Sequence, residues 1–342
     1  MPPAPLAPLE DDDLLREILL RLPPQPSSLP RASAVCKRWR CVAVDPKFTA
    51  RFRAHHGKPP LLGVFQHRDD GIVFAPVLAP PDRVPPERFD LRIPDDNPYL
   101  GPQLLGCRHG RVLVFDRPRA EVLVCDPIAG EERRVAVPPE FRTAGVNGAV
   151  LCADRGQGAR RLPLQPLQGS TCGGSQSILV GNVLYWLLSH AEGGILQFDL
   201  DRQSLDVIEA PPRMDVPRSW QIVRAEDGTL GLAILSHRYH NIQMWQRKVN
   251  CNGVGTWVLL KTTEMHDIHG LPPPARRGME LIRGYAEDAD EIFLYLDGIV
   301  YMVQLKSMRS RKLWETHHIT LCHSFNSFYT PGIGIAGARY NG

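Results

Sequence analysis

The sequence predicts an α+β multidomain protein in which a small all-α module precedes a larger all-β domain. Up to Gly57, apolar residues recur at helical spacing between acidic residues and prolines that are typical of helix ends. From Lys58 onward, short runs of β-forming residues are separated by Gly, Pro, Asp and Asn. We therefore expect a disordered N-terminus over 1–8, a helical module over 9–57 and a β-domain over 58–342.

The first helix is expected to begin at Asp12 or Asp13, because carboxylates at a helix start accept hydrogen bonds from unpaired N–H groups. Apolar residues then fall on one face at helical spacing, namely Leu14, Leu15, Ile18, Leu19 and Leu22. Leu20 is left over on the polar side. Pro23 and Pro24 should end the helix, since proline removes a donor and clashes with the preceding turn.

A second helix is expected from Ser27 or Ser28 with Pro30, and its apolar stripe is Val35, Trp39 and Val42. Asp45 and Pro46 repeat the signal for a helix start, and a third helix through Phe48 and Phe52 should stop at Gly57. A module of about fifty residues has too little surface to bury a good core alone. We therefore expect a partner.

The order of these motifs resembles an F-box. The resemblance is carried by the acidic run, the apolar helix, the stop Leu22-Pro23-Pro24 and the string Val35-Cys36-Lys37-Arg38-Trp39-Arg40. One departure is that the family usually opens with Leu-Pro, whereas here Leu9 is followed by Glu10. The resemblance implies docking on a Skp-type adaptor and, through it, on a cullin scaffold. The adaptor-binding residues would be Leu14, Leu15, Ile18, Leu19, Leu22, Pro23, Val35, Cys36 and Trp39.

Internal repetition in the β-domain predicts a propeller. The segment 122–126, which leads to 134–139, matches 195–199, which leads to 207–212, at a constant offset of 73. Ala225-Glu-Asp-Gly228 and Ala286-Glu-Asp-Ala289 lie 61 residues apart, each before a fresh strand pair. Such units are typical of kelch-type blades, and at ~45–50 residues per blade the chain allows about six. A β-sandwich is the alternative.

The F-box, the linker 54–65 and the string 104–111 together resemble a large grass family of F-box proteins with a kelch-like associated domain. The resemblance weakens between Phe141 and Gln176. Because the segment 142–176 is poor in β-forming residues and rich in Gly, Ser and Pro, we expect an incomplete, mobile blade there that proteases cut first. The end from Gly332 to Gly342 offers little to close a ring.

Composition excludes several classes of function. A net charge of +3 gives no reason to expect nucleic acid or a membrane as partner. No secretion signal and no apolar run of about 18 residues occurs, so we expect a soluble protein in the cytoplasm, the nucleus or both. The eight cysteines form no C-x-x-C pair and should be free, mostly buried thiols.

The sequence offers no enzyme motif, so we expect a protein without catalytic residues, cofactor or metal. The pairs His237/His240 and His266/His269 should be surface or turn histidines. The string 332–337 fits a dinucleotide fingerprint but has no helix after it. Core packing is the expected role of the strand aromatics, which are Tyr185, Trp186, Trp220, Trp245, Trp257, Tyr295 and Trp314.

The leading hypothesis is thus a substrate receptor, in which the helices hold the adaptor and the propeller holds a protein target for ubiquitination. One alternative is a ligand-binding or sugar-binding kelch-type propeller whose N-terminal helices are only a structural cap. The other is a non-functional, divergent F-box paralogue.

Overall fold

The computed structural model describes residues 11–68, 71–89, 91, 93, 101–138, 146–151, 176–188, 194–211, 219–236, 240–272 and 279–329. The helices of this part are α1 Asp12–Leu20, α2 Ser28–Ser33, α3 Lys37–Val44 and α4 Pro46–His56. None of them is long and apolar enough to cross a membrane. The expected disordered segment 1–8 lies outside the described residues.

The ends of α1 and α4 follow the local signals of the sequence. Asp11 caps α1, where its carboxylate accepts a hydrogen bond from N of Asp13 at 2.8 Å. Asp45 caps α4 in the same way, ahead of Pro46. Gly57 ends α4 with a φ of 67°, a backbone conformation that favours glycine. These starts and stops were predicted correctly because neighbouring residues decide them.

The expected single helix with Val35, Trp39 and Val42 on one stripe is wrong. The chain forms two helices there, because Cys36 is extended, with φ −162° and ψ 171°, between α2 and α3. Val35 therefore lies outside both helices. The first helix also stops earlier than expected, at Leu20, so that Pro23 and Pro24 follow a turn.

The rest of the described chain consists mainly of strands. In chain order they are β1 Leu61–Arg68, β2 Gly71–Pro76, β3 Gln103–Arg108, β4 Arg111–Asp116, β5 Glu121–Asp126, β6 Glu131–Ala136, β7 Ile178–Val180, β8 Val183–Leu187, β9 Gly194–Asp199, β10 Ser204–Glu209, β11 Ser219–Arg224, β12 Leu230–Ser236, β13 Asn241–Val249, β14 Gly255–Glu264, β15 Glu280–Ala286, β16 Glu291–Leu296, β17 Ile299–Gln304, β18 Arg309–Glu315 and β19 His323–Asn326. Short 3-10 helices, η2 Pro86–Phe89 and η4 Met265–Asp267, follow β2 and β14.

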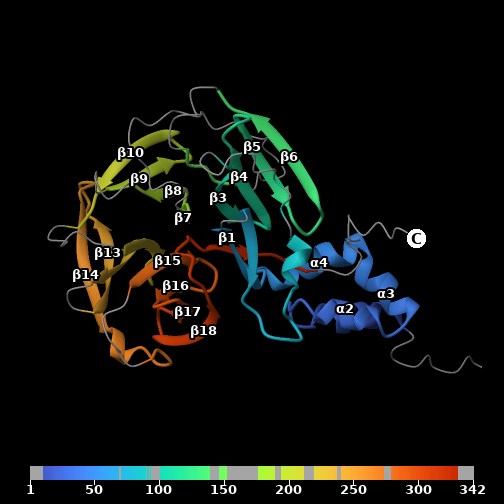
Figure 1. The fold of residues 1–342 in the computed structure, drawn as a ribbon. Coiled ribbons are helices and arrows are strands. Elements are labelled where there is room, and N and C mark those ends of the chain that lie inside the picture. The colour runs from blue at the N-terminus through green and yellow to red at the C-terminus, as the bar shows by residue number, and fades with distance from the viewer. Residues whose placement is uncertain are drawn as a thin grey trace, which may run out of the picture.

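These strands form a five-bladed β-propeller with the helices outside the ring (Figure 1). Four sheets contain four consecutive strands each: β3–β6, β7–β10, β11–β14 and β15–β18. The fifth has the order β19-β1-β2, and β19 pairs antiparallel with β1 from Phe65 opposite His323 to Leu61 opposite Asn326. The last described strand thus closes the ring onto the first. A β-sandwich is excluded by this arrangement.

The sequence repeats mark equivalent parts of neighbouring blades. Asp126 and Asp199 each end the third strand of a sheet, and each accepts two backbone N–H groups of the next turn at 2.9–3.0 Å. The segments 225–228 and 286–289 are the turns after the first strands, β11 and β15. The acidic residue in each unit is therefore a turn cap.

The expected number of about six blades is wrong. The inner strands of four blades begin at Gln103, Ile178, Ser219 and Glu280, so that two of them use more chain than the ~45–50 residues assumed. In the described residues, the sheet with three strands is the closing one, and the blade β7–β10 has four. Most of the segment 142–176, where an incomplete blade was expected, lies outside the described residues. The ring closes through 323–326, ahead of the Gly332–Gly342 end.

The helical module packs against the propeller. Its core consists of Leu15, Leu19, Leu20, Leu29, Ala32, Val42, Phe48 and Phe52, with Phe328 from the segment after β19 packed on it. The rings of Phe52 and Phe328 meet edge to face at 6.2 Å. N of Ser27 donates a hydrogen bond to Oδ1 of Asp82 at 3.1 Å. The module thus buries a core of its own and uses the propeller to complete it.

Candidate adaptor-binding surface and propeller axis

Helix α1 divides its apolar residues between the core and the surface. Leu15 and Leu19 are 0% exposed, whereas Leu14 is 41% exposed and Ile18 is half-buried. Leu20, expected on the polar side, is buried, and its carbonyl lies 3.1 Å from Nε2 of His56 in α4. The expectation that Leu15 and Leu19 are available to a partner is therefore wrong, because the four helices enclose them.

The connection between α2 and α3 adds apolar surface. Val35 is 63% exposed, and the Cys36 thiol is exposed beside it. Trp39 is half-buried against the helical core. Nε of Arg38 donates a hydrogen bond to Oδ1 of Asp12 at 2.7 Å, which ties the start of α3 to the start of α1. Val35 and Cys36 therefore lie at the end of the module where α1 begins.

The remaining residues expected to bind an adaptor are at least partly accessible. Leu22 is half-buried and Pro23 is exposed. We call the accessible set the outer face of the module, and it consists of Leu14, Ile18, Leu22, Pro23, Val35, Cys36 and Trp39. The ion pair between Asp12 and Arg38 at this face was missed by sequence reasoning, which treated the acidic run only as a helix start.

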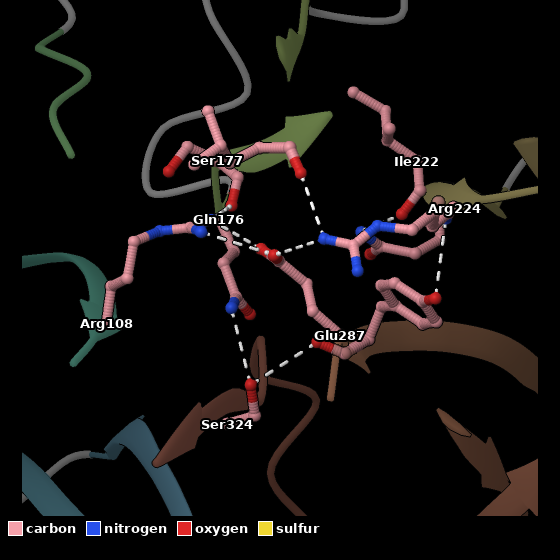
Figure 2. Close-up of polar contacts among 10 residues, drawn as sticks. Arg108, Gln176, Ser177, Ile222, Arg224, Glu287 and Ser324 are labelled. Atoms are coloured by element: carbon pink, nitrogen blue, oxygen red, sulfur yellow. Dashed lines mark hydrogen bonds and ion pairs between the residues drawn. The ribbon is translucent and has the colours of Figure 1, made fainter. Parts of the chain in front are cut away.

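A second cluster of polar groups lies where the inner strands of the five blades meet (Figure 2). Nη1 and Nη2 of Arg108, at the end of β3, both donate to the carboxylate of Glu287, which follows β15. Nη2 of Arg108 also donates to the carbonyl of Ser177 at 3.1 Å. Arg224, at the end of β11, lies 3.6 Å from Glu287 and donates to the carbonyl of Leu179 in β7.

The closing strand joins the same cluster. Oγ of Ser324 in β19 donates to the carbonyl of Tyr285 at 3.4 Å and accepts from Nε2 of Gln176 at 3.4 Å. The hydroxyl of Tyr285 donates to Asp290 at 2.9 Å. Every blade thus contributes a group. No local motif announces this cluster, since Arg108 and Glu287 are 179 positions apart.

Burial governs the electrostatics of the cluster. The side chains of Arg108 and Glu287 are 13% and 11% exposed. Burial raises the pKa of Glu287, although Arg108 and Arg224 act in the opposite direction. Burial also raises the pKa of Tyr285, and the neighbouring Asp290 adds to this effect. The cluster is therefore a desolvated ion-pair network that joins the blades at the propeller axis.

In the described part of the chain, the histidine pairs and the strand aromatics do not come together in a metal-binding or catalytic site. No group of three or more His, Cys, Asp or Glu side chains there is placed to hold a metal ion. Nδ1 of His240 lies 3.3 Å from Glu280, and His237 falls outside the described residues, as does the string 332–337. Among the strand aromatics, Tyr185, Trp186, Trp220 and Tyr295 are buried and the others half-buried, which agrees with core packing.

The described cysteines are free thiols, half of them buried. Burial raises the pKa of Cys125 to about 11, with Glu132 contributing, and that of Cys322 to about 12. These two thiols stay protonated at neutral pH. The expectation of mostly buried thiols fails for Cys36, Cys41 and Cys251, which are exposed.

Comparison with known families bears on both parts of the chain. Residues 11–51 match the F-box domain. Residues 159–325 match the family described as F-box protein AT5G49610-like, beta-propeller. A comparison with curated proteins gives no match.

Several solved structures show a weak likeness. KlHsv2 with loop 6CD replaced by a Gly-Ser linker is 14% identical at a TM-score of 0.39, over 78% of this chain and 85% of that chain. Kluyveromyces marxianus Hsv2 is 13% identical at a TM-score of 0.37, over 75% and 83% of the two chains. At these scores the likenesses carry no argument about function. The family matches find an F-box domain in the helical module and, in the propeller, a domain similar to the β-propeller of F-box protein AT5G49610-like.

Proposed function

We propose that this protein is a non-catalytic substrate-recognition subunit of a Skp-cullin-F-box type ubiquitin ligase. The outer face of the helical module binds the Skp-type adaptor, and the propeller binds a protein target. We also propose that the protein is located in the cytoplasm, the nucleus or both. We propose as well that it is a kelch-like F-box protein of the grass type.

The observation that carries the proposal is the exposed apolar surface on a module that already has a closed core. Leu15 and Leu19 fill that core, so the exposure of Leu14 and Val35 and the partial exposure of Ile18 are not a packing failure. Exposed apolar side chains that gather on one part of a protein typically mark an interaction site, and Leu14 and Val35 both lie at the end of the module where Arg38 bonds to Asp12. Each such side chain stabilises a complex by ~1.5–3 kcal/mol when fully covered. F-box domains generally bind Skp-type adaptors, and the F-box match covers this face.

The main alternative assigns the helices a purely structural role. The contacts of Phe52 with Phe328 and of Ser27 with Asp82 do fasten the module to the propeller. These contacts do not involve residues of the outer face. If the helices were only a structural cap, nothing would favour apolar residues on that face. The two functions therefore make different predictions for Cys36, which lies on that face.

Alkylation of Cys36 tests the proposal. We expect a recombinant Skp-type adaptor to slow modification of Cys36 in the full chain by at least about tenfold, since exposure controls thiol reactivity. Peptide mass spectrometry separates this thiol from the others. Cys251 is the matched control, because it is also exposed but lies in the turn between β13 and β14. Equal labelling of Cys36 with and without a saturating excess of adaptor would favour the structural cap.

A further inference from the structure

We propose that the outer strand β14 is a docking edge for an extended, acidic segment of a partner protein, which pairs with it as an additional strand. This inference rests on the proposed function, because it names the surface on which the propeller holds its target. It is carried by a difference between β14 and the outer strands of the other blades.

Four of the five outer strands are protected in ways that natural sheets use against unwanted pairing, namely by charge or by cover. β6 is exposed along its whole length and carries Glu131, Glu132, Arg133 and Arg134. β18 carries Arg309, Arg311, Lys312 and Glu315, and β10 carries Asp206 and Glu209. β2 is largely buried, and its Phe74 packs edge to face on Phe89 of η2 at 4.6 Å.

β14 lacks this protection in its central stretch. Val258, Leu259 and Leu260 are consecutive and are 37%, 43% and 49% exposed. A regular strand would turn alternate side chains to opposite faces. Here Met244 pairs with Lys261 and Trp245 with Leu259, so that Leu260 is the extra residue of a bulge. Val258 and Leu259 lie in the regular stretch and point to opposite faces of the strand, so the three apolar side chains, which we call the ridge, flank the outer edge of β14 on both faces.

The edge is held in place before any partner arrives. β14 pairs with β13 from Val249 opposite Gly255 to Asn241 opposite Glu264. The indole of Trp257 packs on the core between blades, and its Nε1 donates to the carbonyl of Glu209 in the neighbouring blade at 2.9 Å. From Gly255 to Leu259 the pairing is regular. An added strand therefore meets a preformed template, which lowers the entropy cost of binding.

Charge selects the kind of partner. Lys261 in β14 and Lys248, which lies opposite Thr256 in β13, are exposed, and the sequence has no Asp or Glu between Arg247 and Thr263. Glu264, at the far end of β14, accepts a hydrogen bond from Asn241 at 3.3 Å. Like charges on paired strands are destabilising, which disfavours pairing of β14 with the β14 of a second copy. An extended segment that alternates apolar and acidic residues complements both the ridge and the basic side chains.

Defined peptides test this inference on the full chain. The probe is a capped peptide of about ten alternating valine and glutamate residues, which is long enough to pair along the strand. We expect it to bind at least about tenfold more tightly than the matching valine and lysine peptide, and less tightly at high salt. Binding should slow hydrogen exchange of amides in β14. A peptide with prolines at alternate positions should not bind, because it lacks the N–H donors.

A matched pair of variants locates the site. Val258→Glu should weaken binding of the acidic peptide by at least about tenfold, because it places like charge and a polar group on the ridge. Val135→Glu makes the same change on the outer strand β6, where Val135 is also exposed, and should leave binding unchanged. Thermal unfolding of both variants checks that they fold. If Val258→Glu does not fold, the location of the peptide site is decided by which amides of the wild-type protein the peptide protects from hydrogen exchange.

The inference is overturned if both charged peptides bind equally, if protection falls outside β14, or if the chain dimerises through β14 without peptide. Adaptor binding is measured on the same preparations. A protein that binds the adaptor but not the acidic peptide contradicts only the docking edge. A protein that fails to bind the adaptor contradicts the proposed function, whatever the peptide does.

Discussion

The helical module divides its apolar side chains between a core and an outer face, whereas the propeller turns most of its apolar side chains inward. In β12 six consecutive residues are buried, because neighbouring blades cover both faces of the sheet. In α1 only Leu15, Leu19 and Leu20 are buried, and Leu14 stays at the surface. In the described residues, the closed ring leaves most of its exposed apolar side chains on outer strands and in turns. An open bundle of four helices leaves a whole flank for a partner.

The largest expected effect is a difference in unfolding free energy between variants that break an ion pair in the propeller and in the helical module. Arg108→Met leaves the buried Glu287 with only the more distant Arg224, and breaking such a pair costs ~3–5 kcal/mol of unfolding free energy. Arg38→Met removes the partner of Asp12 in the helical module, where both side chains are more exposed, and should cost less than about 1 kcal/mol. Chemical denaturation of both variants measures the difference.

The stability of the Arg108→Met variant should also depend on pH in a characteristic way. Without Arg108, the pKa of Glu287 rises further, so its carboxylate is unfavourable at neutral pH and becomes protonated as the pH falls. The stability deficit of Arg108→Met should therefore shrink on acidification. A deficit that is the same at every pH would show that lost packing, and not the buried charge, is responsible.

The next effect concerns the two faces of α1. Leu19→Ala opens a cavity in the helical core and should destabilise the module by ~2–5 kcal/mol. Leu14→Ala removes the same atoms from an exposed position and should change stability by no more than about 0.5 kcal/mol. Hydrogen exchange in α1–α4 and in the propeller reports the two regions separately. Equal effects of the two variants would contradict the division of α1 into inner and outer faces.

The propeller should show an acid sensitivity that originates in its closing strand. His323 is buried in β19, and burial lowers its pKa to about 4. Because the folded pKa lies below the unfolded value near 6.5, the unfolded chain takes up the proton first, and stability falls as pH drops from about 6.5 towards 4. This loss amounts to ~3 kcal/mol at pH 4.

His323→Leu isolates this contribution. Within the described residues Nδ1 of His323 has no hydrogen-bond partner, so an apolar replacement loses no hydrogen bond at that nitrogen. The wild type should lose more stability than the variant between pH 7 and 4. The raised pKa values of Glu287, Asp290 and Glu291 act in the opposite direction, but they are common to both proteins and cancel in the difference. Parallel pH profiles would contradict the assignment.

The sequence predicted those features that neighbouring residues decide. The start of α1 at Asp12, the start of α4 at Pro46 and the stop at Gly57 depend on local hydrogen bonds and backbone conformation. The blade repeats were visible because Asp126 and Asp199 cap equivalent turns. These signals gave the order of a helical module and a propeller. The count of blades failed because it relied on an average blade length.

Other features depend on contacts between distant parts of the chain. Helical spacing placed Leu14 and Leu15 on one face, but only the packing of α4 and Phe328 decides which of them is covered. Cys36 is extended between α2 and α3, a break that the helical spacing of Val35, Trp39 and Val42 does not reveal. The cluster around Glu287 gathers residues from five blades, each unremarkable in its own segment. The propeller axis could therefore not be predicted from one sequence.

The most direct test of the account is the affinity of the full chain for a recombinant Skp-type adaptor after Ile18→Ala. Ile18 is half-buried on the outer face and lies outside the buried core. We expect binding to weaken by at least about tenfold, or ~1.4 kcal/mol, while thermal unfolding of the propeller stays unchanged. Ile319→Ala, the same change at an exposed position after β18, is the control and should bind normally. Normal binding by Ile18→Ala would contradict the claim that the outer face of the helices binds the adaptor. Unfolding of the propeller in this variant would contradict the claim that Ile18 does not support the propeller.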